Sequence, residues 1–154
     1  MRVELVCVHK LGRTPEAELA LDYAARATAA GRALAIAPVS IVEVEARKPG
    51  REAEAAGVTP HLTDAYVIAC DEHGRALPSR AFAERLGRLR DDGVRRVVFI
   101  IGGADGLAPS VLDAAHERLA FGPQTWPHAL ARVMLAEQVY RAVTILAGSP
   151  YHRD

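Results

Sequence analysis

The sequence closes on three side chains that can do chemistry. Tyr151, His152 and Arg153 follow Pro150, just after a long apolar run has ended at Gly148. A phenol ring stacks on an unpaired base, an imidazole exchanges protons near neutral pH, and a guanidinium binds phosphates or an imide oxygen. Terminal residues are, however, often disordered. From the residue types alone, an active-site tail and a disordered end both stay open.

A glycine-rich loop at residues 102–106 is the second candidate site. It is not a P-loop, because Leu107 stands where the second glycine of that motif belongs. It is not a dinucleotide fingerprint either, because Ala104 takes the place of the required second glycine. Gly102 and Gly103 still allow a ligand to approach the backbone closely. A plain strand-to-helix turn explains the same residues equally well.

A third candidate is the connection at residues 121–128, which holds two prolines and the only tryptophan of the chain. Proline fixes its own backbone and biases the preceding Trp126 towards an extended conformation. A stiff, extended segment keeps its N–H and C=O groups in place, and that suits recognition of an adenine edge. The alternative is a rigid connection with Trp126 packed in the core.

The remaining histidines and the cysteines indicate neither a metal site nor a disulfide. Cys7 and Cys70 lie far apart in apolar runs, and no paired-cysteine motif occurs. Four histidines lack the spacing of metal ligands, and we expect them at the surface or in the core; they are His9, His61, His73 and His116. We therefore predict no bound metal.

Alternating strands and helices must position these candidate loops. Apolar patterning predicts strands at residues 3–8, 39–46, 65–70 and 94–101. Helices are predicted from Thr14, as the N-cap, to Gly31, from 80 to 92 with Ser79 as the cap, from Pro109 to about Leu119, and along the apolar run that ends at Gly148. Residues 47–57 are polar and predict an exposed loop with room for a short helix.

This alternation predicts an α/β fold, with a mostly parallel sheet flanked by helices, in one domain over residues 1–154. Ligands of such sheets bind beyond the carboxyl ends of the strands. Residues 70–74, 102–106 and 121–128 all follow a predicted strand or lead out of the next helix. We expect them to share one site.

Composition excludes several classes of protein. Half of the residues are hydrophobic and a quarter are charged, as in a globular domain, and no apolar run approaches the roughly 20 residues of a membrane span. The N-terminus lacks a signal-peptide pattern, so a cytoplasmic protein is expected. The 19 basic and 19 acidic residues cancel, and this balance disfavours a stand-alone protein that holds free nucleic acid by charge.

The last predicted helix is apolar on more than one face. Its apolar residues are Leu130, Val133, Met134, Val139, Tyr140, Val143 and Leu146. One sheet covers only one stripe of a helix. The surplus predicts a subunit interface, most simply that of a two-fold homodimer.

Three motifs together resemble one family closely. They are "FIIGGADGL", "TWPHALARVMLAEQVYRA" and "SPYHRD", in this order. They are similar to the small SPOUT-class enzymes called ribosomal RNA large subunit methyltransferase H, most strongly from Val67 to Asp154. The resemblance implies a SPOUT-type α/β fold with a C-terminal trefoil knot, a homodimer, and methylation of N3 of a pseudouridine in 23S ribosomal RNA on assembled ribosomes. It implies S-adenosylmethionine as the cofactor.

The resemblance also implies which residues form the site. Those expected at the cofactor are Cys70, Gly103, Gly122, Pro123, Gln124, Thr125, Trp126 and Pro127. Those expected near the reacting atoms are His128, Tyr151, His152 and Arg153, with the base left unassigned. Cys70 replaces a usual leucine, and Ala104 and Asp105 replace a frequent Pro-Glu pair. A SPOUT-like methyltransferase of another RNA and a non-catalytic nucleotide-binding α/β module are the alternatives.

Overall fold

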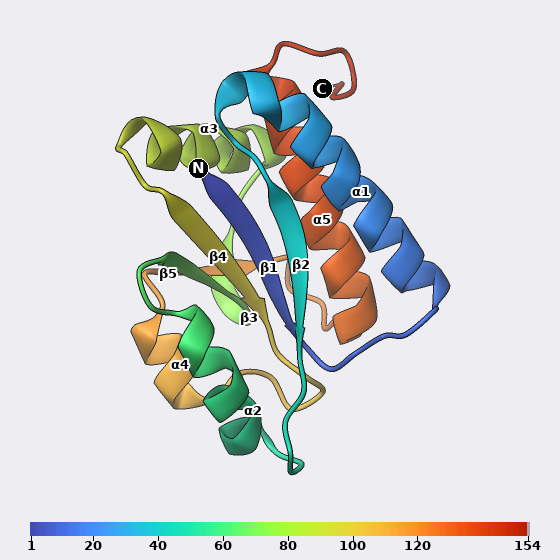
Figure 1. Ribbon diagram of the computed structural model, residues 1–154, viewed down its shortest axis with the longest axis vertical. Coiled ribbons are helices and arrows are strands. Elements are labelled where there is room, and N and C mark those ends of the chain that lie inside the picture. The colour runs from blue at the N-terminus through green and yellow to red at the C-terminus, as the bar shows by residue number, and fades with distance from the viewer. Residues whose placement is uncertain (154) are drawn as a thin grey trace.

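One parallel sheet of five strands organises the protein. A computed structural model describes residues 1–153; Asp154, the last residue of the predicted domain and tail, lies outside the described residues. The strands are β1 (Arg2–Val8), β2 (Val39–Val44), β3 (Tyr66–Ala76), β4 (Arg96–Ile101) and β5 (Glu117–Ala120). Their order across the sheet is β2-β1-β4-β3-β5, and every pairing is parallel (Figure 1).

Helices cover both faces of the sheet (Figure 1). They are α1 (Pro15–Gly31), α2 (Arg51–Val58), α3 (Ser79–Asp91), α4 (Pro109–Ala114) and α5 (His128–Leu146), with the 3-10 turns η1 (Arg32–Leu34) and η2 (Thr59–His61). The helices α1, α3 and α5 pack on one face, and α2 and α4 pack on the other. The predicted α/β architecture is therefore confirmed, and the trefoil knot stays a prediction.

The central strand β4 shows why the sheet needs helices on both sides. Val97, Phe99 and Ile101 belong to the core beneath α1, α3 and α5. Val98 and Ile100 belong to the core beneath α2 and α4. Successive side chains of a strand point to opposite faces, so a continuous apolar run is buried twice. This run ends at the glycine-rich loop, which is thereby held at the carboxyl edge of the sheet.

The start of α1 and the helix in the polar segment agree with the sequence pattern. Thr14 caps α1, and its Oγ1 accepts a hydrogen bond of 3.2 Å from the backbone N–H of Ala17. The segment that was expected to be exposed contains α2, which buries Ala55 and Val58 against the sheet. The segment is mostly polar in sequence, but one face of its helix is packed against the sheet.

The predicted helix that begins at Pro109 is shorter than its pattern indicated. The helix α4 ends at Ala114, and Ala115 is already extended. Glu117 to Ala120 then form β5, which pairs with β3 at the edge of the sheet. The prediction was wrong because a four-residue strand with two charged residues carries too little apolar pattern to be recognised.

Two further predictions were wrong: the end of β3 and the cap of α3. The strand does not stop at Cys70 but continues to Ala76 through an irregularity in its pairing with β5. Gly74 permits this close pairing, because a Cβ there would lie 2.7 Å from backbone atoms of β5. Ser79 does not cap α3; its hydroxyl donates to the side-chain oxygen of Gln138 on α5, at 2.8 Å.

Candidate functional site

A cavity of about 700 Å³ opens at the carboxyl ends of the strands. Three segments form it: the irregular part of β3 that begins at Cys70, the loop after β4, and the segment after β5. Of the residues predicted to hold a cofactor, those that line the cavity are Cys70, Gly103, Gly122, Gln124, Thr125, Trp126 and Pro127. His128 lines it as well, whereas Pro123 is not among the lining residues. Residues of the three candidate segments thus line one cavity, and their role as a cofactor site stays a prediction.

Strand register brings these segments together. Cys70 of β3 lies level with Ile101 of β4 and with Leu119 of β5, and all three line the cavity. Burial raises the pKa of the Cys70 thiol, so the thiol stays protonated and forms a weakly polar floor. The replacement of a leucine by Cys70 therefore keeps an uncharged floor.

The glycine-rich loop is folded tightly on itself. The backbone N–H of Gly106 donates to the carbonyl of Gly103 at 3.1 Å. A Cβ at Gly103 would lie 2.6 Å from the Nε2 of His9 and 2.9 Å from a carboxylate oxygen of Glu54. Gly103 is thus required by two neighbouring side chains on one side while its other surroundings belong to the cavity. A plain strand-to-helix turn would not by itself explain the close approach of His9 and Glu54 to Gly103.

The segment after β5 holds its tryptophan at the surface of the cavity. The indole N–H of Trp126 donates to the backbone carbonyl of Phe121 at 3.3 Å. The Trp126 side chain is 38% exposed, so the alternative of a core tryptophan is wrong. Thr125 contributes its hydroxyl, which lies 3.5 Å from a carboxylate oxygen of Glu72 across the cavity mouth. This segment offers both a ring and backbone groups to a ligand.

His128 begins α5 at the inner end of the cavity. Burial lowers the pKa of its imidazole, and the nearby His9 and the guanidinium of Arg132 lower it further, against a smaller opposite effect of Glu54. The ring centroids of His9 and His128 are 5.8 Å apart. A neutral imidazole can accept a proton, so His128 has the form that a base requires.

His9 and Glu54 form a polar pair that no pattern in the sequence indicates. The Nε2 of His9 lies 3.1 Å from Oε1 of Glu54, whose side chain is buried. The other carboxylate oxygen of Glu54 is buried without a hydrogen-bond partner in the described part of the chain. Glu54 sits in a polar stretch that reads as exposed, and only the packing of α2 against the sheet brings it here.

Arg132 fixes the position of His9. It is 2% exposed, forms an ion pair with Glu43 of β2, and donates from Nη2 to the backbone carbonyl of His9 at 2.8 Å. His9 has a positive φ of 71°, which a residue with a side chain rarely adopts. The arginine therefore secures a strained turn beside the cavity. In the sequence, the only indication of this role is that Arg132 interrupts the apolar pattern of the last helix.

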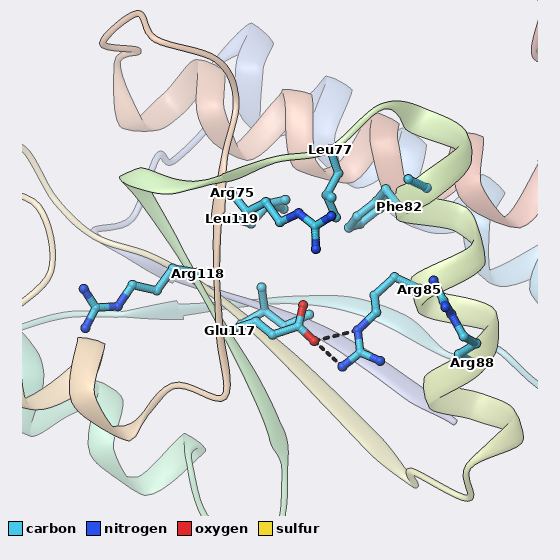
Figure 2. Close-up of a pocket in the computed structure, with 10 residues that line it drawn as sticks. Arg75, Leu77, Phe82, Arg85, Arg88, Glu117, Arg118 and Leu119 are labelled. Atoms are coloured by element: carbon cyan, nitrogen blue, oxygen red, sulfur yellow. Dashed lines mark hydrogen bonds and ion pairs between the residues drawn. The ribbon is translucent and has the colours of Figure 1, made fainter.

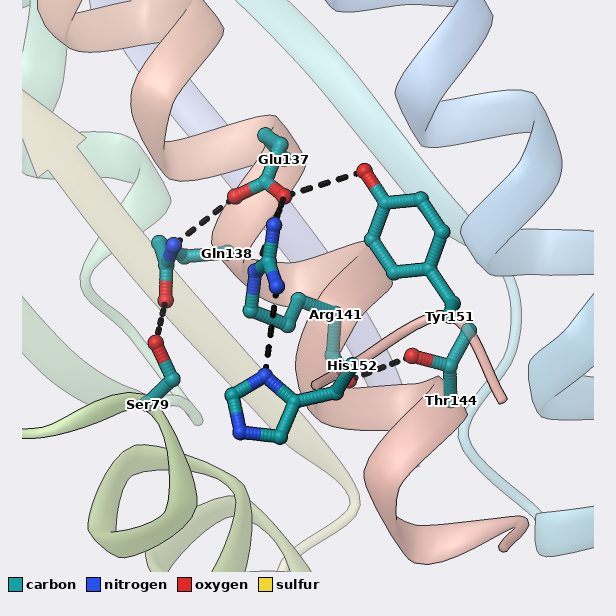
Figure 3. A network of polar contacts seen from close by, with 7 residues as sticks. All are labelled: Ser79, Glu137, Gln138, Arg141, Thr144, Tyr151 and His152. Carbon is teal, nitrogen blue, oxygen red and sulfur yellow. Dashed lines mark hydrogen bonds and ion pairs between the residues drawn. The ribbon is translucent and has the colours of Figure 1, made fainter. Parts of the chain in front are cut away.

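The predicted catalytic tail is docked on α5 (Figure 3). The hydroxyl of Tyr151 donates to Oε1 of Glu137 at 3.1 Å, and its ring packs 4.7 Å from the ring of Tyr140. Arg141 pairs with Glu137, lies 5.0 Å from the centre of the Tyr151 ring, and approaches Nδ1 of His152 at 3.2 Å. These contacts favour an organised tail over a disordered one.

The docked tail does not reach the cavity of its own chain through these contacts. Tyr151 and His152 contact the part of α5 around Glu137 and Arg141. His128 lies 13 residues before Arg141, which corresponds to about 20 Å along a helix axis. Arg153 is exposed. The structure therefore brings His128 to the cavity at the carboxyl ends of the strands but leaves Tyr151, His152 and Arg153 outside its lining.

An apolar groove joins these two regions. It has a volume of about 520 Å³, and Leu19, Tyr23, Val133 and Met134 line it together with Glu137 of the tail network. The segment 119–122 lines both the groove and the cofactor cavity. Leu19, which lines the groove, is 45% exposed, and Leu130 of α5, outside the groove lining, is 42% exposed. The uncovered apolar surface of α5 is smaller than predicted, because α1 buries Val139 and Val143.

Residues 1–153 contain neither a cluster of metal-binding side chains nor a helix able to span a membrane. No group of three or more histidine, cysteine, aspartate or glutamate side chains in this range is arranged to hold a metal ion. No helix in the same range has the length and apolar content of a membrane span.

Comparison with known families classifies the chain. The family described as "Predicted SPOUT methyltransferase" matches residues 1–152. The chain therefore belongs to the SPOUT methyltransferase family. Its relatives include a protein of Caulobacter sp. (strain K31), 75% identical over the whole of both chains, and one of Phenylobacterium zucineum (strain HLK1), 68% identical over the whole of both. Each of these relatives is named "Ribosomal RNA large subunit methyltransferase H".

Solved structures agree with the fold. A probable methyltransferase from Bordetella pertussis Tohama I superimposes with a TM-score of 0.54 at 16% identity, covering 92% of this chain and 96% of that one. A probable methylase family protein from Haemophilus influenzae Rd KW20 gives a TM-score of 0.52 at 14% identity, covering 99% of this chain and 70% of that one. At these identities the similarity concerns the fold.

Proposed function

We propose that this protein transfers the methyl group of S-adenosylmethionine to N3 of a pseudouridine in large-subunit ribosomal RNA. The observation that carries the proposal is the convergence of three segments, one inside β3, one after β4 and one after β5, around one cavity in a chain of the SPOUT methyltransferase family. Relatives that match the whole chain at 68–75% identity carry the name of a large-subunit ribosomal RNA methyltransferase. The motifs of the tail and of the glycine-rich loop support the same activity.

The cavity suits the cofactor chemically. Gly122 to Pro127 form a stiff segment whose backbone groups can bind the adenine edge, and Trp126 adds an exposed ring. The protonated thiol of Cys70 provides an uncharged floor. Gly103 leaves the adjoining backbone accessible. When bound, S-adenosylmethionine supplies an activated methyl group, so the protein has mainly to position it.

The transfer requires a proton to leave the RNA. The bond between sulfur and the methyl carbon breaks, a bond between this carbon and N3 forms, and the N3 proton departs while the sulfonium becomes a thioether. His128 is the candidate acceptor, because it lines the cavity and its lowered pKa keeps it neutral. Tyr151, His152 and Arg153 are proposed to hold the pseudouridine, by stacking and by hydrogen bonds to its oxygens.

A homodimer reconciles the tail with the cavity. In one chain the tail binds α5 near Glu137, outside the cavity lining. The groove beside Glu137 continues into the cavity through the shared segment 119–122. We infer that a second copy packs over this groove, covers Leu19 and Leu130, and brings its own tail to the cavity. Each site would then combine the cavity of one protomer with the tail of its partner.

Assembled ribosomes in the cytoplasm are the proposed partner. Equal numbers of basic and acidic residues disfavour tight binding of free RNA by charge alone. A folded ribosomal surface supplies shape as a further basis for recognition. The pseudouridine is accordingly expected to be methylated on the particle and poorly on protein-free RNA.

The decisive experiment uses labelled cofactor and ribosomes from a strain that lacks this gene. Purified protein should label one pseudouridine of the large-subunit RNA, and the label should be absent from the wild-type ribosomes, whose site is already modified. Label in another RNA would favour a SPOUT-like enzyme of different specificity. Cofactor binding in calorimetry without transfer to any ribosomal fraction would favour a non-catalytic nucleotide-binding module. Either result would overturn the proposal.

A further inference from the structure

A second charged cavity lies at the edge of the sheet, between β3, β5 and α3 (Figure 2). Its volume is about 510 Å³. Four arginines and one glutamate line it, with apolar residues between them; the charged residues are Arg75, Arg85, Arg88, Glu117 and Arg118. In a chain with a formal net charge of zero, this is a local concentration of positive charge. The proposed transfer reaction does not use it.

One ion pair at this cavity is internally satisfied. The Nε of Arg85 donates to Oε1 of Glu117 at 2.6 Å, and its Nη2 donates to the hydroxyl of Tyr66 at 2.7 Å. The Tyr66 hydroxyl donates to the same carboxylate oxygen at 2.7 Å. This three-residue cluster ties α3 to β3 and β5. It gives the cavity a fixed wall in which positive and negative charge compensate each other.

The surplus charge lies on Arg75 and Arg88. Both are exposed, and neither forms a hydrogen bond through its guanidinium or an ion pair within residues 1–153. Figure 2 shows the Arg75 guanidinium directed into the space that faces Arg85, and Arg118 directed away from it. Arg118 approaches Asp113 at 3.4 Å, and both are exposed, so this contact is weak. Two guanidinium groups are thus available beside a rigid wall.

We propose that this cleft, defined by Arg75 and Arg88, binds the phosphate backbone of the large-subunit RNA near the methylated pseudouridine. The inference rests on the proposed function. A guanidinium keeps its charge at every physiological pH, and its planar fork matches two phosphate oxygens. The cleft lies beside β5, the edge strand of the sheet, where a polymer can approach it from outside.

The position of the cleft connects it with the reaction site. Leu119 of β5 lines the cleft, the apolar groove and the cofactor cavity. An RNA strand that crosses β5 can therefore contact the arginines with one nucleotide and present another to the cavity. Phosphate contacts of this kind carry no sequence information, but they fix the register of the substrate. Arg75 and Arg88 would thus position the RNA without taking part in the chemistry.

The test compares Arg75→Gln, Arg88→Gln and the double variant with Arg51→Gln. Arg51 is an exposed arginine on α2, which covers the opposite face of the sheet, so it serves as the matched control. Filter binding to protein-free large-subunit RNA is measured across salt concentrations. The slope of log affinity against log salt is negative, and each lost phosphate contact should make it shallower by about 0.7. The double variant should make it shallower by about 1.4. The control should keep the slope of the wild type.

Methylation of large subunits provides the second readout. The double variant should raise the KM for subunits about tenfold, with kcat within about twofold and cofactor affinity unchanged. Unchanged salt slopes overturn the inference. A loss confined to assembled particles, with normal binding of protein-free RNA, assigns the cleft to a ribosomal protein and overturns it too. If the wild type methylates no ribosomal fraction, the proposed function fails. The salt slopes of RNA binding would still show whether the cleft binds RNA phosphates.

Discussion

Glu137 accepts hydrogen bonds from Tyr151 and from Arg141 on the same carboxylate oxygen, Oε1. The residue that fastens the tail is therefore also the one that holds Arg141 under the Tyr151 ring. Gln138, the neighbour of Glu137, donates to its second oxygen at 2.8 Å and accepts from Ser79 of α3 (Figure 3). The tail is thus positioned by a network that spans two helices, as a substrate-binding group requires.

Removal of residues 151–154 should abolish activity while preserving the fold. We expect methyl transfer to ribosomes to fall at least about 100-fold, because groups that position the substrate are lost. Cofactor affinity should change little, since the cavity lining contains none of these residues. Single-turnover assays and calorimetry measure the two effects. Near-normal methylation by the shortened protein would return the tail to the interpretation of an idle end.

Gly103→Val should block cofactor binding. A side chain at this position would press on His9 and Glu54 and would displace the loop that lines the cavity, and overpacking of this kind typically costs about 1–3 kcal/mol of stability. Calorimetry on the folded variant gives the affinity, and thermal unfolding gives the stability. Unchanged affinity would contradict the assignment of the pocket.

A companion variant separates the two effects of a side chain at Gly103. In Gly103→Ala with His9→Ala, the imidazole that a Cβ would meet at 2.6 Å is absent. Stability should then recover relative to Gly103→Ala alone. If cofactor affinity recovers to the same extent, the glycine serves the packing of His9, and its place beside the ligand is refuted.

Leu19→Glu should convert a dimer into a monomer. Leu19 lines the apolar groove and is 45% exposed, so a glutamate there disturbs the proposed interface but little of the monomer core. Sedimentation at micromolar concentration should show dimers for the wild type and monomers for the variant. Leu21→Glu is the control, because Leu21 is 58% exposed on the same helix and is absent from the groove lining. A monomeric wild type would refute the dimer.

The lowered pKa of His128 predicts how stability depends on pH. Its usual value of 6.5 applies in the unfolded chain, and burial, with His9 and Arg132 nearby, lowers the pKa in the folded protein. The unfolded state thus binds the proton more readily. This contribution to stability is complete above pH 6.5 and is lost as the pH falls through the lower folded value.

His128→Asn removes this titration. Urea unfolding of both proteins at several pH values between 7.5 and 5 measures the effect. The wild type should lose more stability over this interval than the variant does. Equal losses would show that His128 gains no protonation penalty on folding.

The sequence predicted the elements with strong local signals and missed those defined by partners. Thr14 and Gly31 bound α1 as expected. Thr14 acts as a local cap, whereas Gly31 has a right-handed backbone and is required because a Cβ there would lie 1.9 Å from the carbonyl oxygen of Ile36. The strand β5 was missed because Glu117 and Arg118 interrupt its pattern, and its extended state depends on pairing with β3. Ser79 looked like a helix cap, but Gln138, 59 residues away, takes its hydroxyl.

The candidate site likewise contains residues that the sequence predicted and residues that it did not. The residues that line the cavity lie at the irregularity inside β3 and at or just beyond the carboxyl ends of β4 and β5, and the general geometry of parallel sheets places them together. Glu54 and Arg132 were not predicted, because their roles depend on how α2 and α5 pack against β1 and β2. The position of the tail on Glu137 depends on side-chain contacts within 14 residues, and no periodicity encodes them.

Trp126 gives the protein a built-in optical probe. It is the only tryptophan of the chain, it is 38% exposed, and its indole lies in the wall of the cavity, bonded to the carbonyl of Phe121. Emission excited at the red edge of the absorption band therefore originates from one place, next to the ligand. A bound cofactor should shield Trp126 from acrylamide. Quenching of its emission, measured at increasing cofactor concentrations, therefore gives a binding curve on unlabelled protein. The same signal, followed in a stopped-flow instrument, would time cofactor arrival separately from methyl transfer.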